Sequence, residues 1–155
     1  MSDRGVEERV ARFRERCVRE GLKVTHQRLE IFRVLAGTDE HPDAESVYRA
    51  VRERIPTISL DTVYRNLNCM LDHGLISIIG LPFNRFRFDG NTDPHHHFVC
   101  VKCGRIFDFR TPAFDGVLVP EEADVFGEVL SLQVDIKGIC HTCRRKEWGG
   151  GRGAG

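Results

Sequence analysis

Histidines and cysteines gather in one short stretch of the chain, and both side chains are common ligands of transition metals. Three consecutive histidines, residues 95–97, lie just before Cys100 and Cys103. A second Cys-x-x-Cys pair, Cys140 and Cys143, follows after a spacer of 36 residues. These residues predict metal chemistry, and the rest of the chain is expected to position them.

The four paired cysteines have the spacing of a structural zinc site. Each pair can chelate from a tight turn, and together Cys100, Cys103, Cys140 and Cys143 supply four thiolates for a tetrahedral Zn²⁺. The spacer exceeds the usual zinc-ribbon range of about 15–20 residues. Disulfides are the alternative, but they are uncommon in the cytosol. A thioredoxin-like redox motif would lie at the start of a helix, which we expect for neither pair.

The histidines favour a second metal site of a different character. On a strand, His95 and His97 point to one face and His96 to the other. Asp108 lies on the neighbouring strand candidate, and Asp89 lies a few residues before the histidines. Nitrogen and carboxylate ligands suit Fe²⁺ or Mn²⁺, although such a site also binds Zn²⁺. The spacing alone leaves a solvated, histidine-rich turn as an equal alternative.

Length and composition describe a globular chain without a strong charge bias. The 155 residues allow one medium domain or two small ones. The 23 basic and 23 acidic residues cancel, so any DNA contact must come from local placement of charge. No apolar run approaches the roughly 18 residues of a membrane span, and the polar N-terminus does not resemble a secretory signal. We therefore expect a cytoplasmic protein without a membrane partner.

The first part of the chain has the pattern of a small helical domain. Apolar residues recur at three- and four-residue spacing, and Thr25, Asp43 and Ser59 are placed to cap successive helices. The last of these helices, Leu60 to His73, has one apolar side and one polar side. The sequence therefore predicts several helices, of which the last could present its polar side to a partner.

Two strand candidates follow, Leu75–Ile79 and Arg85–Asp89. In the second, both arginines project from one face while Phe86 and Phe88 are expected to pack. Helices followed by a basic hairpin outline a winged helix-turn-helix, with Leu60 to His73 in the place of the recognition helix. A helical domain with a hairpin and no DNA role remains the alternative.

A polar, turn-rich stretch at residues 90–94 marks a domain boundary. Beyond it we expect strands at 95–101 and 105–109, a short helix near 121–127 and a half-buried strand over 130–137. The predicted organisation is a DNA-binding domain over 1–90, a metal-binding domain over 94–147 and a disordered Gly-rich tail over 148–155. The second domain is small enough to need a metal, an oligomer or both.

Several short motifs occur in a fixed order along the chain. They are Gly21-Leu22-Lys23-Val24-Thr25-x-x-Arg28, His41-Pro42, Ser59-x-x-Thr62-Val63-Tyr64-Arg65-Asn66-Leu67, Arg85-Phe86-Arg87-Phe88-Asp89 and His95-x-His97-Phe98-x-Cys100-x-x-Cys103-Gly104. Each motif alone is weak, but together they closely resemble the ferric uptake regulator family of bacterial metal-dependent repressors. The resemblance covers about Val10 to Lys146.

The resemblance implies an α+β homodimer with an N-terminal winged helix-turn-helix domain and a small C-terminal α/β dimerisation domain. It implies structural zinc on the four paired cysteines. It also implies a regulatory Fe²⁺ or Mn²⁺ site whose ligands come from both domains: His41, Asp89, His95, His97 and Asp108. One ion bound by all of them would select a closed dimer whose recognition helices are spaced for two half-sites.

By the same resemblance the partner is double-stranded DNA carrying a palindromic A/T-rich operator. Tyr64 and Arg65 would contact bases and backbone in the major groove. Lys23 would reach the phosphates or the minor groove, and Arg28 a phosphate. The implied function is transcriptional repression, not catalysis.

The resemblance is greatest to the peroxide-responsive branch of this family. Asp108 stands where the iron-responsive branch usually has glutamate, and residues 133–136 lack a histidine that many iron-sensing members use. In that branch bound iron leads to oxidation of a ligand histidine, and His41 and His95 match the sensitive positions. The alternatives are a repressor that senses iron or zinc availability and, less favoured, a non-haem iron enzyme.

Overall fold

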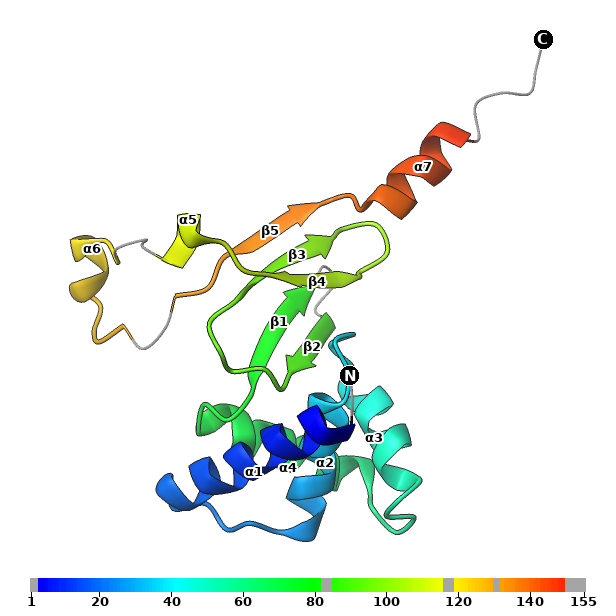
Figure 1. The fold of residues 1–155 in the computed structure, drawn as a ribbon, viewed down its shortest axis with the longest axis vertical. Helices are drawn as coiled ribbons and strands as arrows, with labels where there is room; N and C mark the ends of the chain where they lie inside the picture. The colour runs from blue at the N-terminus through cyan, green and yellow to red at the C-terminus, as the bar shows by residue number, and fades with distance from the viewer. Residues whose placement is uncertain (1–2, 82–84, 116–118, 130–131, 150–155) are drawn as a thin grey trace. The chain divides into compact units, whose positions relative to one another are not determined.

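The computed structural model describes residues 3–81, 85–115, 119–129 and 132–149. The chain divides into two compact units, Met1–Thr92 and Asp93–Gly155, the first mainly helical and the second built on a sheet (Figure 1). This mixture of helices and strands confirms the predicted α+β class. Within the described ranges, no helix combines the length and the apolarity that a membrane crossing requires.

The N-terminal unit consists of helices followed by a hairpin. Its elements are α1 (Asp3–Arg19), α2 (His26–Ala36), α3 (Ala44–Arg52), α4 (Leu60–Asp72), β1 (Ser77–Leu81) and β2 (Arg85–Asp89). The predicted N-caps are confirmed, because the side chains of Thr25, Asp43 and Ser59 each accept a hydrogen bond from the backbone N–H three residues later. Gly74, with φ of 61°, follows α4 in a conformation that glycine adopts readily.

The core of this unit forms where the apolar sides of its helices meet. The rings of Phe13 on α1 and Phe32 on α2 stack with their centroids 3.9 Å apart. Ile31, Leu67 and Met70 are completely buried, and burying a side chain of this size stabilises a fold by about 1.5–3 kcal/mol. The unit therefore has a core of its own, which leaves the polar side of α4 in solvent.

The hairpin differs from the expectation at one aromatic residue. Strands β1 and β2 pair antiparallel, with Ile78 opposite Phe88 and Gly80 opposite Phe86. Phe88 is buried, but Phe86 is 52% exposed, so the prediction that both rings pack is wrong for Phe86. Its cross-strand neighbour is a glycine, which offers no side chain for the ring to pack against.

A three-stranded sheet with short helices forms the C-terminal unit. The elements are β3 (His96–Cys100), β4 (Ile106–Phe109), α5 (Pro112–Asp115), α6 (Glu121–Asp124), β5 (Asp135–Gly138) and α7 (His141–Gly149). The strand order is β4-β3-β5, with β4 antiparallel and β5 parallel to β3. Strand β3 is thus central and carries two of the three histidines, His96 and His97, together with Cys100.

The end of this unit departs from the sequence expectation. Strand β5 begins at Asp135, and its Ile136 is 40% exposed, so the prediction of a half-buried strand is wrong there. Strand β5 lies at the edge of the sheet, where its side chains have fewer neighbours. Helix α7 reaches Gly149, which includes the first two residues of the predicted tail, whereas residues 130–131 and 150–155 lie outside the described ranges.

Candidate metal centres and nucleic-acid interface

The four paired cysteines come together at one end of the C-terminal sheet. Cys100 is the last residue of β3, and Cys103 lies in the turn that follows. The parallel pairing places Gly138 of β5 opposite Cys100, so Cys140 arrives at the same corner two residues later. Cys143 follows on the first turn of α7. The sheet register therefore brings both Cys-x-x-Cys pairs to one place.

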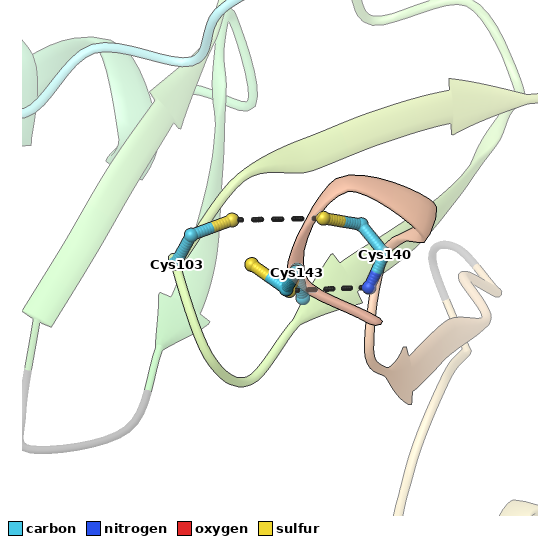
Figure 2. A group of neighbouring side chains, drawn as sticks. Cys103, Cys140 and Cys143 are labelled. Carbon is cyan, nitrogen blue, oxygen red and sulfur yellow. Dashed lines mark hydrogen bonds between the residues drawn. The ribbon is translucent and has the colours of Figure 1, made fainter. Parts of the chain in front are cut away.

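Their sulfur atoms have the separation that a tetrahedral zinc site requires. All four lie within 4.8 Å of one another, and the Sγ atoms of Cys103 and Cys140 are 3.9 Å apart (Figure 2). The backbone N–H of Cys140 also donates to the sulfur of Cys100 at 3.3 Å. Zinc–sulfur bonds of about 2.3 Å imply sulfur–sulfur distances of about 3.8 Å in a tetrahedron. The Cys103–Cys140 pair matches this distance, and the 4.8 Å limit means that the other pairs would need only small side-chain movements to bind Zn²⁺.

The protonation chemistry of this cluster also favours a cation. Burial opposes ionisation of Cys100, but backbone N–H groups of Cys140, Cys103 and Lys102 outweigh it and lower the Cys100 pKa to about 6. The opposite holds for Cys143, where hydrogen bonding with Cys140, burial and the other nearby sulfurs raise the pKa to about 12. Four crowded thiols therefore do not all ionise by themselves, whereas a divalent metal stabilises all four thiolates.

The second cysteine pair lies where a redox motif could also lie. Helix α7 begins at His141, so the pair Cys140 and Cys143 does lie at the start of a helix, contrary to expectation. A helix N-terminus favours a thiolate at this position. A thiolate favoured by the helix N-terminus is equally suited to binding zinc. The proximity of Cys100 and Cys103 distinguishes this cluster from an isolated redox pair.

Three of the predicted regulatory ligands converge within the C-terminal unit. The Nε2 atom of His95 lies 3.8 Å from Oδ2 of Asp108, and the Nε2 atom of His97 lies 3.5 Å from Oδ1 of the same carboxylate. Residues His97 and Asp108 are opposite one another on β3 and β4. Two imidazoles that face the same carboxylate form a set of nitrogen and oxygen donors that suits Fe²⁺ or Mn²⁺.

The other ring nitrogen of each histidine has a different partner. Nδ1 of His95 lies 2.7 Å from the backbone carbonyl oxygen of Asp93. Nδ1 of His97 lies 3.3 Å from Oδ1 of Asp135 and 2.8 Å from Nε2 of Gln133. Asp135 and Gln133 are not among the residues predicted from the sequence, because nothing in the sequence indicates that β5 pairs with β3 in parallel.

His41 and Asp89 form the corresponding pair within the N-terminal unit. Nε2 of His41 lies 3.7 Å from Oδ2 of Asp89, and both side chains are buried. The backbone N–H of Phe88 donates to the carbonyl oxygen of Pro42 at 3.0 Å, and the guanidinium of Arg87 pairs with Asp43 at 3.1 Å. The loop that carries His41 is therefore held alongside β2, the strand that carries Asp89.

The backbone of His41 is strained. Its φ of 51° lies in the left-handed region, which costs a residue with a Cβ of order 1–3 kcal/mol. Such a conformation persists when the surroundings enforce it, and the contacts of Pro42 and Asp43 with β2 do so here. The imidazole faces Asp89, and a strained backbone is a property expected of a functional position.

Asp43 makes a testable contribution to this loop. Partial burial opposes its ionisation, but hydrogen bonds from Ser46 and the positive charges of Arg87 and Arg49 outweigh it and lower the Asp43 pKa below its usual 3.8. A carboxylate with a lowered pKa in the folded state contributes stability above the unfolded pKa and loses it as the pH falls through the folded pKa.

We therefore expect Asp43→Ala to reduce the free energy of unfolding by about 1 kcal/mol at neutral pH, mainly through loss of the N-cap. The partly exposed ion pair with Arg87 should add little. The deficit should shrink below about pH 4, which urea unfolding across a pH series would measure. Asp39→Ala, in the preceding exposed loop, is the control. A deficit that grows toward acid would contradict this account.

The side of α4 that faces solvent carries the predicted DNA-reading residues. Tyr64 is 42% exposed, and Arg65 forms an exposed ion pair with Asp61 at 3.0 Å. A hollow of about 570 Å³ lies between α4, the start of α3 and the hairpin. Its lining includes Tyr64, Asn68, Arg85, Phe86 and Arg87. The exposed Phe86 is thus part of the same surface as the predicted recognition residues.

Arg28 and Arg65 lie at a second hollow, of about 310 Å³, beside the first turns of α2 and α4. Two arginines and two helix N-termini suit a phosphate group. Arg28 is half-buried: it donates to the carbonyl oxygen of Lys23 and lies 3.8 Å from the sulfur of Cys69. The side chain of Lys23 is exposed. All four predicted DNA-contacting residues therefore belong to the N-terminal unit.

His96 is the member of the histidine run that joins neither metal cluster. Its ring packs beside Phe109 and Phe114, at centroid distances of 5.7 and 5.1 Å. Its Nδ1 accepts a hydrogen bond from the backbone N–H of Val134 at 3.4 Å. His96 alternates with His97 along β3, so it points to the opposite face of the sheet. In this structure its ring packs against two aromatic side chains of the same unit.

Comparisons with known proteins agree with these features. A family model described as "Ferric uptake regulator family" matches residues 19–122. A peroxide-responsive repressor of Staphylococcus epidermidis is 33% identical over 144 residues, which are 93% of this chain and 93% of that protein.

Solved structures resemble the chain as well. The peroxide stress regulator of Campylobacter jejuni has a TM-score of 0.63 and 27% identity, covering 84% of this chain and 95% of that one. The ferric uptake regulator from Francisella tularensis, solved with iron, has a TM-score of 0.63 and 28% identity, covering 80% and 96%. The likeness spans most of each chain.

Proposed function

This chain belongs to the ferric uptake regulator family, and on that premise we propose that it is a metal-dependent, DNA-binding transcriptional repressor that responds to peroxide. The observation that carries the proposal is the convergence of His95 and His97 on Asp108. This is a nitrogen and carboxylate donor set, separate from the four cysteines. The repressor would act in the cytoplasm on double-stranded DNA and would not be an enzyme.

The two metal centres would have different tasks. Zn²⁺ on Cys100, Cys103, Cys140 and Cys143 would hold the C-terminal unit together. Fe²⁺ or Mn²⁺ would bind His95, His97 and Asp108 from one unit and recruit His41 and Asp89 from the other. Neither unit supplies a full set of five ligands, so one shared ion would restrain the two units relative to each other.

We propose that the restrained arrangement is the one that binds DNA. Metal binding would then raise the affinity for DNA, because both ligands bind the same arrangement and their binding equilibria are linked. A homodimer would place two copies of α4 at two half-sites of a palindromic, A/T-rich operator. The open edge of β5 and the 40% exposed Ile136 on it support association between C-terminal units.

DNA would be read by the N-terminal unit. Tyr64 and Arg65 would contact bases and backbone, and the hollow that Arg28 and Arg65 line would accept a phosphate. Lys23 would add a further phosphate or minor-groove contact. Because the chain has no net charge, this local clustering of positive residues would carry the electrostatic attraction to DNA.

Peroxide sensing is supported by the aspartate at position 108 and by relatives that carry that function in their names. When bound, iron would mediate a net reaction in which hydrogen peroxide gives one oxygen atom to a carbon of a ligand imidazole and its other oxygen leaves as water, the two electrons coming from the imidazole. We propose His41 and His95 as the oxidised residues. Loss of a ligand would then release the restraint between the units and lower DNA affinity.

The test is DNA affinity with Fe²⁺ and with Mn²⁺, each before and after hydrogen peroxide. The iron-loaded protein should lose DNA affinity and gain the mass of one oxygen on His41 or His95. The manganese-loaded protein should keep its affinity and its mass. Gel shifts on palindromic A/T-rich DNA and peptide mass spectrometry measure both quantities.

Tyr64→Ala is the control, because it should abolish the shift without changing metal content. An unmodified, iron-loaded protein that keeps its affinity after peroxide would favour a repressor that senses iron or zinc availability. No metal-dependent shift at all, together with turnover of a small substrate, would favour a non-haem iron enzyme.

A further inference from the structure

The ring of His97 is fully buried, and its two nitrogens face different groups. Nε2 is directed at Asp108, whereas Nδ1 lies near Asp135 and Gln133, both from the segment that forms or precedes β5. A histidine that binds a metal through one nitrogen keeps its proton on the other, and that proton needs an acceptor. The groups around Nδ1 therefore influence how well Nε2 can serve as a ligand.

We propose that Asp135 is a positioning residue for the regulatory metal: its carboxylate accepts the Nδ1–H of His97 and keeps Nε2 available to the ion. The inference rests on the proposed metal-dependent function, which it deepens by naming a residue that sets metal affinity. Asp135 itself is not a ligand, since its Oδ1 lies 3.3 Å from the nitrogen on the far side of the ring from Asp108.

The sheet holds Asp135 in this position. His97 and Asp135 are directly paired in the parallel register of β3 and β5, so their side chains project from the same face of the sheet. The backbone N–H of His97 also donates to the carbonyl oxygen of Val134 at 3.1 Å. The alignment of carboxylate and imidazole thus follows from backbone pairing, and it does not depend on a flexible loop.

His95 has a parallel arrangement that supports the assignment. Its Nδ1 lies 2.7 Å from the carbonyl oxygen of Asp93, and its Nε2 is directed at the other oxygen of Asp108. Each histidine therefore has an acceptor behind it and the same carboxylate in front of it. The acceptor of His97 is a carboxylate, whose negative charge makes the imidazole a better metal ligand than a neutral carbonyl does.

Gln133 competes for the same nitrogen. Its amide nitrogen lies 2.8 Å from Nδ1 of His97 and 3.0 Å from Oδ1 of Asp135. An amide N–H can only donate, so this contact is satisfied when Nδ1 carries a lone pair and the proton sits on Nε2, where it blocks metal binding. Asp135 and Gln133 therefore favour opposite forms of His97, so removing Asp135 should weaken metal binding and removing Gln133 should not.

The experiment is a titration of the zinc-containing protein with Mn²⁺, with free Mn²⁺ followed by electron paramagnetic resonance. We expect Asp135→Ala to weaken Mn²⁺ binding by about 10–100-fold, the usual effect of removing such a partner. Asp135→Asn, which keeps a neutral acceptor, should fall between Asp135→Ala and the unaltered protein. Gln133→Ala should bind Mn²⁺ as tightly or more tightly. Glu128→Gln, an exposed carboxylate of the same unit, should have no effect.

Zinc content and DNA affinity at saturating Mn²⁺ should be unchanged in all four variants, which shows that each one folds. If the Mn²⁺ affinity of Asp135→Ala stays within about twofold of the unaltered protein, the proposal is overturned. Equal weakening by Asp135→Ala and Gln133→Ala would also overturn it, because that result is expected if both residues only maintain the local structure. Failure of the unaltered protein to bind Mn²⁺ would overturn the proposed function as well. Weakening by the two Asp135 substitutions, without weakening by Gln133→Ala, supports the positioning role.

Discussion

Replacing Cys140 with serine should release zinc and unfold the C-terminal unit. Among the described residues of that unit, the buried apolar side chains are Val99, Cys100, Ile106 and Cys140. Two of these four are members of the cysteine cluster, so the proposed metal would provide much of the stabilisation that a larger apolar core would otherwise provide. Structural zinc contributes about 10–16 kcal/mol of apparent binding free energy, far more than so small an apolar core supplies.

Elemental analysis of zinc and limited proteolysis would measure this effect. The variant should lose its zinc and become protease-sensitive beyond Thr92, while α1 to α4 resist cleavage because their core is separate. Cys69→Ser is the matched control: it removes a half-buried thiol of the N-terminal unit and should retain zinc. A Cys140→Ser protein that keeps its zinc and its protease resistance would exclude this cysteine as a ligand.

Removing the His41 imidazole should abolish the response of DNA binding to metal. The proposed ion needs ligands from both units, and His41 is a buried member of the N-terminal pair. Coupling between two bound ligands usually changes affinity by about 5–150-fold. In the variant, DNA affinity with Mn²⁺ should therefore fall by a factor in this range, to the value without metal.

Glycine is the best substitution at position 41, because it adopts the observed φ of 51° without strain and offers no side-chain ligand. Fluorescence anisotropy on operator DNA, with and without Mn²⁺, would measure the response. His73→Ala is the control, since His73 lies in the same unit and bonds to the backbone carbonyl of Cys69. If His41→Gly still gains DNA affinity on adding Mn²⁺, His41 does not link the units.

The helical half of the fold was predictable because its signals are local. Thr25, Asp43 and Ser59 each cap the helix that follows, and a cap acts through an N–H only three residues away. The hairpin was also predictable, but the exposure of Phe86 was not. Phe86 is exposed because Gly80 lies opposite it, and only the strand register, which the sequence does not reveal, places Gly80 there.

The sheet of the C-terminal unit was less predictable because its pairing is long-range. Spacing identified the cysteines and the histidines, but it did not show that β5 pairs in parallel with β3. The alternating apolar residues near Ile136 predicted a buried face, whereas an edge strand leaves that face open. For the same reason, Asp135 and Gln133 could not be assigned to His97 from the sequence.

Strand β5 has a practical consequence for anyone who purifies this protein. It begins at Asp135 beside His97 and ends at Gly138, two residues before Cys140. A molecule that has lost zinc should lose the alignment of β5 and, with it, the carboxylate behind His97. A preparation with incomplete zinc would then contain two populations that differ in manganese affinity. Zinc stoichiometry should accordingly be measured on every sample before its manganese or peroxide response is compared with another.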